Sequence, residues 1–159
     1  MVLLPQSDID ALLNAVPSFQ ERWRIDVAER ADFEKRFPKS VRSPEERVDD
    51  FLSDLAAHLG RRVAGGDLHE VEWLAAELER IFERVPVRTT VLLTVGFLES
   101  LVIMIEQAGG DASTVTPLMH GPRVRERWQQ AYGYYHGEYL YDRAEMAESA
   151  DKLPRDPNK

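Results

Sequence analysis

Two pairs of polar side chains have a spacing at which side chains cooperate on a helix. Asp54 and His58 are four residues apart, so a carboxylate and an imidazole would share one helical face and could bind a metal ion. A catalytic metal needs a third protein ligand, and the spacing of the sequence suggests none. The alternative is an exposed carboxylate–imidazole pair without a further role, which a pattern this loose favours.

Glu99 and Glu106 form the second pair. They are seven residues apart and lie nearly on one line of a helix, as do carboxylates that perform acid–base chemistry or hold two irons in a helical bundle. The di-iron pattern also requires Glu-x-x-His pairs on two helices, and the sequence contains none. The alternative is a structural role, in which each carboxylate faces a solvent strip or meets an arginine such as Arg88 or Arg125.

The sequence lacks the other common signatures of catalysis. It has no cysteine, which excludes a thiol nucleophile, a disulfide framework and a thiolate zinc site. It also contains no Gly-x-Ser-x-Gly elbow, no phosphate-binding loop and no His-Glu-x-x-His zinc motif. We therefore expect no cofactor and no bound metal. A helical metal-dependent or hydrolytic enzyme built on the two pairs above is an alternative.

Negative charge is concentrated in one quarter of the chain. The net charge is −8, and residues 44–83 alone carry eleven carboxylates and four arginines, a net charge of −7. Glu46, Asp50 and Asp54 recur there every four residues, and like charges at this spacing destabilise a helix by about 0.2–0.5 kcal/mol per pair. Either arginines elsewhere in the chain neutralise this acidic ridge, or it attracts a basic protein partner. The candidate arginines are Arg22, Arg24, Arg61 and Arg62.

All five tyrosines lie in one stretch of ten residues, from Tyr132 to Tyr141. Tyrosine buries a large ring while its hydroxyl stays wet, so it suits the boundary between core and surface. Tyr132 and Tyr135 fall on the apolar face of the last expected helix, and we expect them to close the core. Tyr134 and Tyr141 point elsewhere, and we expect them to contact a partner.

Trp73 is a further candidate contact, because it lies off the apolar stripe of its expected helix, on the side of Glu77. A tryptophan so placed is either packed by another element of the domain or presented to a partner, where it is a favoured anchor. Glu138 and Asp142 add negative charge beside the tyrosines. The predicted partner-binding residues are Glu46, Asp50, Asp54, Trp73, Glu77, Tyr134, Glu138, Tyr141 and Asp142.

Capping residues and apolar periodicity predict the helices that position these side chains. Ser18 with Glu21, and Ser43 with Glu46, match the capping box, in which a serine and a glutamate three residues later bond the free amides of the first turn. Apolar residues at helical spacing follow the second box, and a further apolar stripe runs over residues 68–85.

The segment over residues 91–108 is apolar on almost every side, which is typical of a helix buried by its neighbours. A membrane span is the alternative, but Glu99 and Glu106 would be costly in hydrocarbon. We therefore expect an all-α fold, an irregular bundle of five to six helices around this central apolar helix. We expect a single domain over residues 1–148, followed by a polar, disordered tail over residues 149–159.

The stretch PLMHGPRVRERWQQAYGYY resembles a group of small helical bacterial proteins of unassigned function. Those proteins are similar in a leucine-rich turn, a Gly-Pro step and a tryptophan six residues after the proline, here Leu118, Gly121-Pro122 and Trp128. The stretches LLNAVPSFQERW and VGFLESL are also similar to that group, although this chain has His120 where the group usually has leucine. The resemblance implies a cytosolic helical domain of a kind often suspected of neutralising a toxin or acting as an accessory protein. It implies no catalytic residue.

These observations favour an acidic protein–protein interaction module, most concretely an immunity-type protein that binds and neutralises a basic toxin. The acidic ridge would dock first, and aromatic side chains would provide the anchors. The negative net charge argues against a nucleic-acid partner, and we expect no membrane association. A homo-oligomeric scaffold, with the tyrosine-rich helix as the self-contact, is a further alternative. The absence of cysteine and of a basic leader before Pro5 favours a cytoplasmic location.

Overall fold

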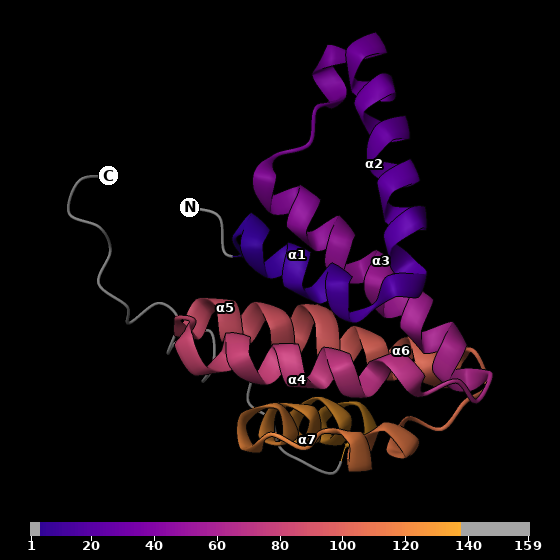
Figure 1. Ribbon diagram of the computed structural model, residues 1–159, viewed down its shortest axis with the longest axis vertical. Coiled ribbons are helices and arrows are strands. Elements are labelled where there is room, and N and C mark those ends of the chain that lie inside the picture. The colour runs from indigo at the N-terminus through magenta and orange to yellow at the C-terminus, as the bar shows by residue number, and fades with distance from the viewer. Residues whose placement is uncertain (1–3, 138–159) are drawn as a thin grey trace.

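Every regular element in the computed structural model, which describes residues 4–137, is helical (Figure 1). This confirms the predicted all-α fold. Two 3-10 helices, η1 (Pro38–Ser40) and η3 (Ala112–Leu118), lie in loops, and a π-helical segment, η2 (Leu92–Leu98), joins two α-helices. Within the described residues the seven α-helices are α1 (Gln6–Ala15), α2 (Pro17–Arg36), α3 (Pro44–Ala64), α4 (His69–Arg84), α5 (Val87–Val91), α6 (Glu99–Gln107) and α7 (Pro122–His136).

The helix count of the described residues exceeds the expected five to six because the central apolar helix is divided. A continuous helical rod runs from Val87 to Gln107, but residues 92–98 widen into the π-helical segment between α5 and α6. Without that division the described residues would show six α-helices. The predicted domain boundary at residue 148 and the predicted tail lie outside the described residues and stay predictions.

The central rod packs as a core helix, chiefly against α3 and α7. Its fully buried side chains include Leu93, Phe97, Leu101 and Ile105. Among the described residues it is also the one helix whose length and mean hydropathy of 1.7 would suit a membrane span, and half of that window is buried inside the bundle. Core helices of globular proteins share this combination of length, hydropathy and burial. Its packing between helices agrees with the core position that the sequence predicts.

Two contacts fix the helices that surround the rod. Gly60 of α3 lies so close to α6 that a Cβ atom at this position would be 2.5 Å from the Cβ of Met104. This glycine therefore sets the close approach of the two helices. Asp8 of α1 is buried and pairs with Arg84 of α4, which holds α1 against the bundle.

The α2 helix leaves the bundle and forms a projecting arm with the chain that follows it (Figure 1). Its base is anchored by Phe19, its one buried residue, which stacks with Trp23 at 5.9 Å between ring centroids. Trp23 in turn meets Phe51 of α3 edge-on at 5.2 Å. Beyond this aromatic cluster the chain runs out along α2, turns through η1 and returns to α3. We call residues 24–43 the arm.

One of the two predicted capping boxes is present. The Oγ of Ser43 accepts the N–H of Glu46 at 3.2 Å, and the carboxylate of Glu46 accepts the N–H of Ser43 at 2.8 Å. The other prediction is wrong, because α2 begins at Pro17 with Val16 as its cap, and no side chain caps it. Proline needs no partner for a first-turn amide. Ser18 therefore lies inside the helix, where its hydroxyl contacts a neighbouring helix.

Candidate functional site

His58 contacts Ser18 rather than Asp54. The Nε2 of His58 lies 2.7 Å from the Oγ of Ser18, and the ring packs against Phe19 at 5.2 Å between centroids. Burial and the nearby Arg62 lower the pKa of His58, so the ring is neutral at neutral pH. A neutral imidazole beside a serine hydroxyl is the arrangement of a base and a nucleophile. Local spacing could not reveal it, because the two residues are 40 positions apart.

The surroundings of Ser18 do not suit acyl transfer. Its backbone N–H donates to the Oε2 of Glu70 at 3.1 Å, so a carboxylate lies where an oxyanion would need hydrogen-bond donors. Glu70 is buried and lies 3.5 Å from Arg62. Two surface cavities found within the described residues are lined by other side chains. This polar cluster joins α2, α3 and α4, and we interpret it as structural.

Asp54 gains no third ligand for a metal site with His58. Its carboxyl is half-buried, and burial together with the negative charge of Asp26 raises its pKa, against the smaller effect of Arg30. Among residues 4–137, no three histidine, aspartate or glutamate side chains come close enough together to hold a metal ion. Within this part of the chain, no three-ligand group therefore supports the metal-dependent alternative.

Glu99 and Glu106, the second candidate pair, differ from each other in their surroundings. The Nε2 of His136 in α7 lies 3.2 Å from the Oε1 of Glu106, and a backbone N–H of η3 donates to the same oxygen at 3.3 Å. Glu106 thereby joins α6 to α7 and η3. Its partner is a histidine, where the sequence suggested Arg88 or Arg125. Glu99 is 3 % exposed and faces the interior rather than a solvent strip.

The acidic ridge of α3 is largely engaged within the chain. Asp50 accepts hydrogen bonds from Arg30 at 2.9 Å and from Arg42 at 2.7 Å. Glu46 completes the cap of α3 and lies 3.9 Å from Arg42. Neutralisation by the chain's own arginines, one of the two alternatives for the ridge, is therefore found at Asp50. The prediction that Asp50 docks a partner loses its premise of a free carboxylate.

Three of the four arginines expected to neutralise the ridge pair with other carboxylates. Arg22 lies 3.9 Å from Asp26, and Arg24 lies 2.6 Å from Glu21, both within α2. Arg62 pairs with a carboxylate just before α4. The ridge instead meets arginines of the arm, because the arm folds back over the first turns of α3. The sequence could not indicate this, since it does not show where the arm turns.

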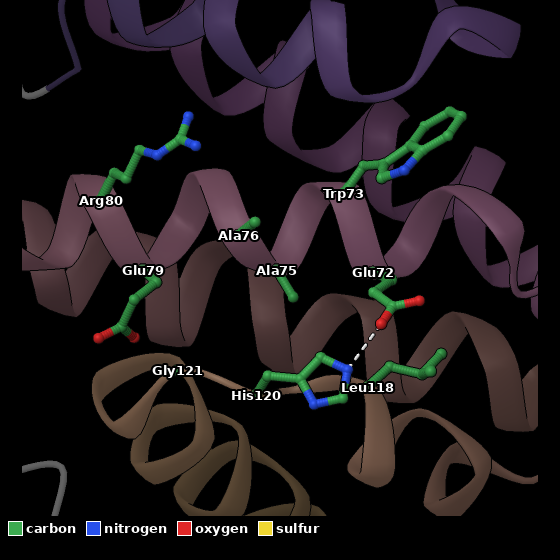
Figure 2. Close-up of a pocket in the computed structure, with 9 residues that line it drawn as sticks. All are labelled: Glu72, Trp73, Ala75, Ala76, Glu79, Arg80, Leu118, His120 and Gly121. Atoms are coloured by element: carbon green, nitrogen blue, oxygen red, sulfur yellow. Dashed lines mark hydrogen bonds and ion pairs between the residues drawn. The ribbon is translucent and has the colours of Figure 1, made fainter.

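A groove opens between α4 and the segment that leads into α7 (Figure 2). Its volume is about 640 Å³, and Ala75, Ala76 and Leu118 contribute much of its apolar lining. Figure 2 shows Trp73 and Arg80 on one edge of α4. Glu72, Ala75 and Glu79 turn from the other edge toward the segment that leads into α7, which forms the opposite wall of the groove. We call this depression the α4 groove. Its lining residues are Glu72, Trp73, Ala75, Ala76, Glu79, Arg80, Leu118, His120 and Gly121.

Two glutamates of α4 fix the opposite wall of the groove. The Oε1 of Glu72 lies 2.7 Å from the Nε2 of His120 (Figure 2). The carboxylate of Glu79 accepts the backbone N–H of Val124 at 2.7 Å, so it caps the first turn of α7 from a neighbouring helix. A Cβ at Gly121 would lie 2.4 Å from this carboxylate, which would have to move. The groove is therefore preformed by contacts within the chain.

Trp73 is presented at the edge of the α4 groove. It is 47 % exposed, although tryptophan is usually mostly buried, and its ring meets His69 edge-on at 4.6 Å. The sequence left open whether another element packs over Trp73, and within the described residues half of the indole stays uncovered. Glu77, the neighbouring predicted contact, lies 2.6 Å from Arg80. The role of both residues in binding stays a prediction.

Trp73 is the one lining residue that the sequence predicted as a contact, and three of the others, Leu118, His120 and Gly121, come from outside α4. They belong to the end of η3 and to the turn before α7, and both η3 and α7 contact α4. The Gly121-Pro122 step marks a tight turn in the sequence. It gives no information about which helix the turn lies against, so only the fold reveals these residues as part of the groove.

The fold divides the tyrosine cluster. Tyr132 packs against the core and lies 6.4 Å from Trp128 between ring centroids, as expected. Tyr135 was expected to close the core, but it is 43 % exposed, because it lies in the last turn of α7 where the described residues do not cover it. Tyr134 is half-buried. Three predicted contacts lie outside the described residues and stay predictions: Glu138, Tyr141 and Asp142.

No protein-family model matches this chain, and no curated protein and no solved structure matches it either. The resemblance to small helical bacterial proteins therefore rests on short motifs alone. The function has to be inferred from the geometry and chemistry of the surface.

Proposed function

We propose that this protein is a protein-binding module that docks its partner on the α4 groove, with Trp73 as the anchor. The observation that carries the proposal is the half-exposed indole of Trp73 at the edge of an apolar depression. Tryptophan is among the side chains most enriched at interface hot spots. The apolar lining, to which Ala75, Ala76 and Leu118 contribute, would receive an apolar side chain of the partner.

The partner that suits this surface is a basic protein. The α4 helix carries five glutamates and two arginines, a net charge of −3, within a chain whose net charge is −8. A surface of one sign speeds encounter with an oppositely charged protein and disfavours other partners. The most concrete form of this role is an immunity-type one, in which the chain binds a basic toxin and covers its active cleft. The proposed docking face moves from α3 to α4, because Asp50 is engaged with the arm.

The groove is suited to tight binding because its walls are already in place. The Glu72–His120 pair and the cap that Glu79 provides for α7 hold the turn against α4. A preformed surface loses little conformational entropy on binding, so more of the interaction energy becomes affinity. The indole of Trp73 contributes a large contact area with few rotatable bonds, which limits the cost further.

Affinity purification from the cells that make this protein tests the proposal. Wild type is compared with Ala76→Arg, which fills the α4 groove, and with Ser53→Arg, which adds the same charge at an exposed position of α3. We expect a basic protein that wild type and Ser53→Arg retain and that Ala76→Arg loses. Binding of the purified partner should weaken as salt rises. Equal retention by all three proteins would reject the α4 groove as the docking surface.

The immunity-type role needs a second readout. Wild type should suppress the toxic activity of the purified partner, and Ala76→Arg should suppress it much less. A basic partner that binds the groove but has no toxic activity would leave the binding module in place and reject the toxin-neutralising role.

A further inference from the structure

The end of the arm exposes apolar side chains that a solitary domain would cover. Of the eight large hydrophobic side chains that are exposed within residues 4–137, five lie in the arm, and three of these, Phe33, Phe37 and Val41, lie at its end. Phe33 and Phe37 are 51 % and 53 % exposed, and their rings lie 4.8 Å apart between centroids. They form one aromatic knob beside η1. We call residues 33–42 the arm tip.

The arm tip is basic, in contrast to the rest of the chain. It contains four cations and one carboxylate, a net charge of +3, whereas the whole chain carries −8. The one carboxylate, Glu34, is turned inward and lies 3.3 Å from Arg47 of α3. Lys35, Arg36 and Lys39 are exposed around the aromatic knob. The tip therefore combines exposed aromatic rings with positive charge.

The arm tip is held in place, so its surface is preformed. Arg30, on the outgoing side of the arm, and Arg42, on its returning side, both donate to Asp50 of α3. This one carboxylate therefore links the two sides of the arm. Glu34 also accepts the backbone N–H of Arg42 at 3.0 Å. The aromatic cluster at the base fixes the other end of α2. Docking of the tip would need little reordering of the arm.

We infer that the arm tip of one copy docks into the α4 groove of a second copy. The groove offers an apolar lining, an exposed indole and the carboxylates of a helix with net charge −3. The tip offers apolar rings surrounded by cations, which is the complementary chemistry. The arm projects away from α4 and α7 of its own chain, whose residues line the groove or lie beside it, so a second copy supplies the tip (Figure 1).

This contact joins two different surfaces, so its geometry decides the size of the assembly. Two reciprocal contacts related by a two-fold axis close a dimer, and contacts that are not reciprocated continue into longer chains. The inference rests on the proposed function in one respect, namely that the α4 groove binds a basic, aromatic-bearing surface. The arm tip then competes with the basic partner, and self-association regulates access to the groove.

Sedimentation velocity of the purified chain over rising concentration tests the inference without any partner. We expect wild type to associate at concentrations up to roughly 100 µM, and to associate less at high salt. Phe37→Glu and Lys39→Glu in the arm tip, and Ala76→Arg in the groove, should each weaken association at least tenfold. Ile25→Glu, a matched change at an exposed position nearer the base of the arm, should leave it unchanged. Circular dichroism establishes that each variant is folded.

Mixing the variants is the decisive step. Phe37→Glu keeps an intact groove and Ala76→Arg keeps an intact arm tip, so the mixture retains one intact contact and should associate more strongly than either variant alone. A wild type that stays monomeric, association that survives both variants, or a mixture that associates no more than either variant would each overturn the inference. A monomeric wild type that still binds a basic partner would reject this inference alone. Self-association without any basic partner would reject the proposed function alone.

Discussion

Arg42 and Asp50 form a bidentate ion pair that closes the arm onto α3. The Nε of Arg42 donates to one carboxylate oxygen at 3.1 Å, and its Nη2 donates to the other at 2.7 Å. Arg30 of α2 donates to the first of these oxygens at 2.9 Å, so one carboxylate holds both sides of the arm. Planar, bidentate pairs of this kind are stronger than single surface contacts. The acid that the sequence offers as a docking residue therefore holds the arm on α3, and its role in docking stays a prediction.

Asp50 and Asp54, one helical turn apart, should respond oppositely to loss of charge. Asp50→Asn removes the acceptor charge from two arginines and should lower the free energy of unfolding by about 1–2 kcal/mol. Asp54→Asn should raise it at pH 7, because burial and Asp26 already raise the pKa of Asp54 and so disfavour its charged form. Solvent screens this half-exposed group, so the gain should be only about 0.3–0.5 kcal/mol. Urea unfolding at pH 7 measures both changes.

Each of these two variants serves as the control for the other, since both convert an aspartate to asparagine on the same helix. Destabilisation of similar size in both would contradict the different surroundings described for the two carboxylates.

His58 should make the protein less stable in mild acid. Burial, followed by Arg62, lowers the pKa of His58 below the ordinary value of 6.5. At pH values between the folded-state pKa and 6.5, the unfolded chain therefore binds a proton that the folded chain does not. The contribution of neutral His58 to the free energy of unfolding is complete above the unfolded-state pKa of 6.5. It is lost as the pH falls from 6.5 to the lower pKa of the folded state. His58→Gln retains a polar partner for Ser18 and should show a smaller loss of stability between roughly pH 7 and pH 5. Thermal unfolding across this range provides the comparison.

The measurement should stop near the lower limit of that range, because the raised pKa of Asp54 acts in the opposite sense in more acidic solution. There the folded chain binds the proton more readily, so stability is gained as the pH falls toward 3.8, the ordinary value for this carboxyl. An unchanged acid sensitivity in His58→Gln would assign the effect to other groups.

The sequence predicts the helices of this protein better than their contacts. Apolar periodicity and the Ser43–Glu46 box place the start of α3 correctly, and the apolar run over residues 91–108 predicts the central rod. Helix periodicity depends on neighbours three and four residues away, which the sequence displays directly. The path of the arm depends instead on where the chain turns after α2. For that reason the arginines that pair with Asp50 could not be identified in advance.

The candidate site shows the same limit. Trp73 could be singled out because it lies off its own apolar stripe, which is a property of one helix. Its place at the edge of a groove depends on Leu118 and His120, which reach α4 only through the turn before α7. The failed cap at Ser18 has a similar cause, since its hydroxyl contacts His58 of α3 in place of its own first turn. Tertiary contacts decide both cases.

Gly60 should be intolerant of even one added carbon. A Cβ at this position would lie 2.5 Å from the Cβ of Met104 and 3.0 Å from its backbone carbon, so α3 and α6 would have to separate. Gly60→Ala should cost about 1–3 kcal/mol in the free energy of unfolding. Gly65→Ala is the matched control, because its φ of −80° suits alanine and its nearest contacts are 3.5 Å away. It should be neutral or stabilise by about 0.5 kcal/mol. Equal costs in chemical denaturation would contradict a close approach at Gly60.

Glu79 should stabilise α7, although it belongs to α4. Its carboxylate accepts the N–H of Val124 and lies against Gly121, so Glu79→Ala removes the cap of the first turn. The loss should be about 1 kcal/mol, as for a local capping residue. Glu79→Gln keeps an acceptor oxygen and should lose less. Hydrogen exchange of the amides in the first turn of α7 measures the effect directly, and unchanged protection in Glu79→Ala would show that the cap is dispensable.

The affinity of the purified basic partner for wild type and for Trp73→Ala tests the central claim most directly. Trp73 is half-exposed and its ring meets that of the surface residue His69, so its removal should leave the melting temperature almost unchanged. Isothermal titration should nevertheless show a loss of at least about 2 kcal/mol, roughly a thirtyfold weaker complex, if the indole is the anchor of the α4 groove. Equal affinities for the two proteins, with the variant fully folded, would contradict the claim that a partner docks on this groove.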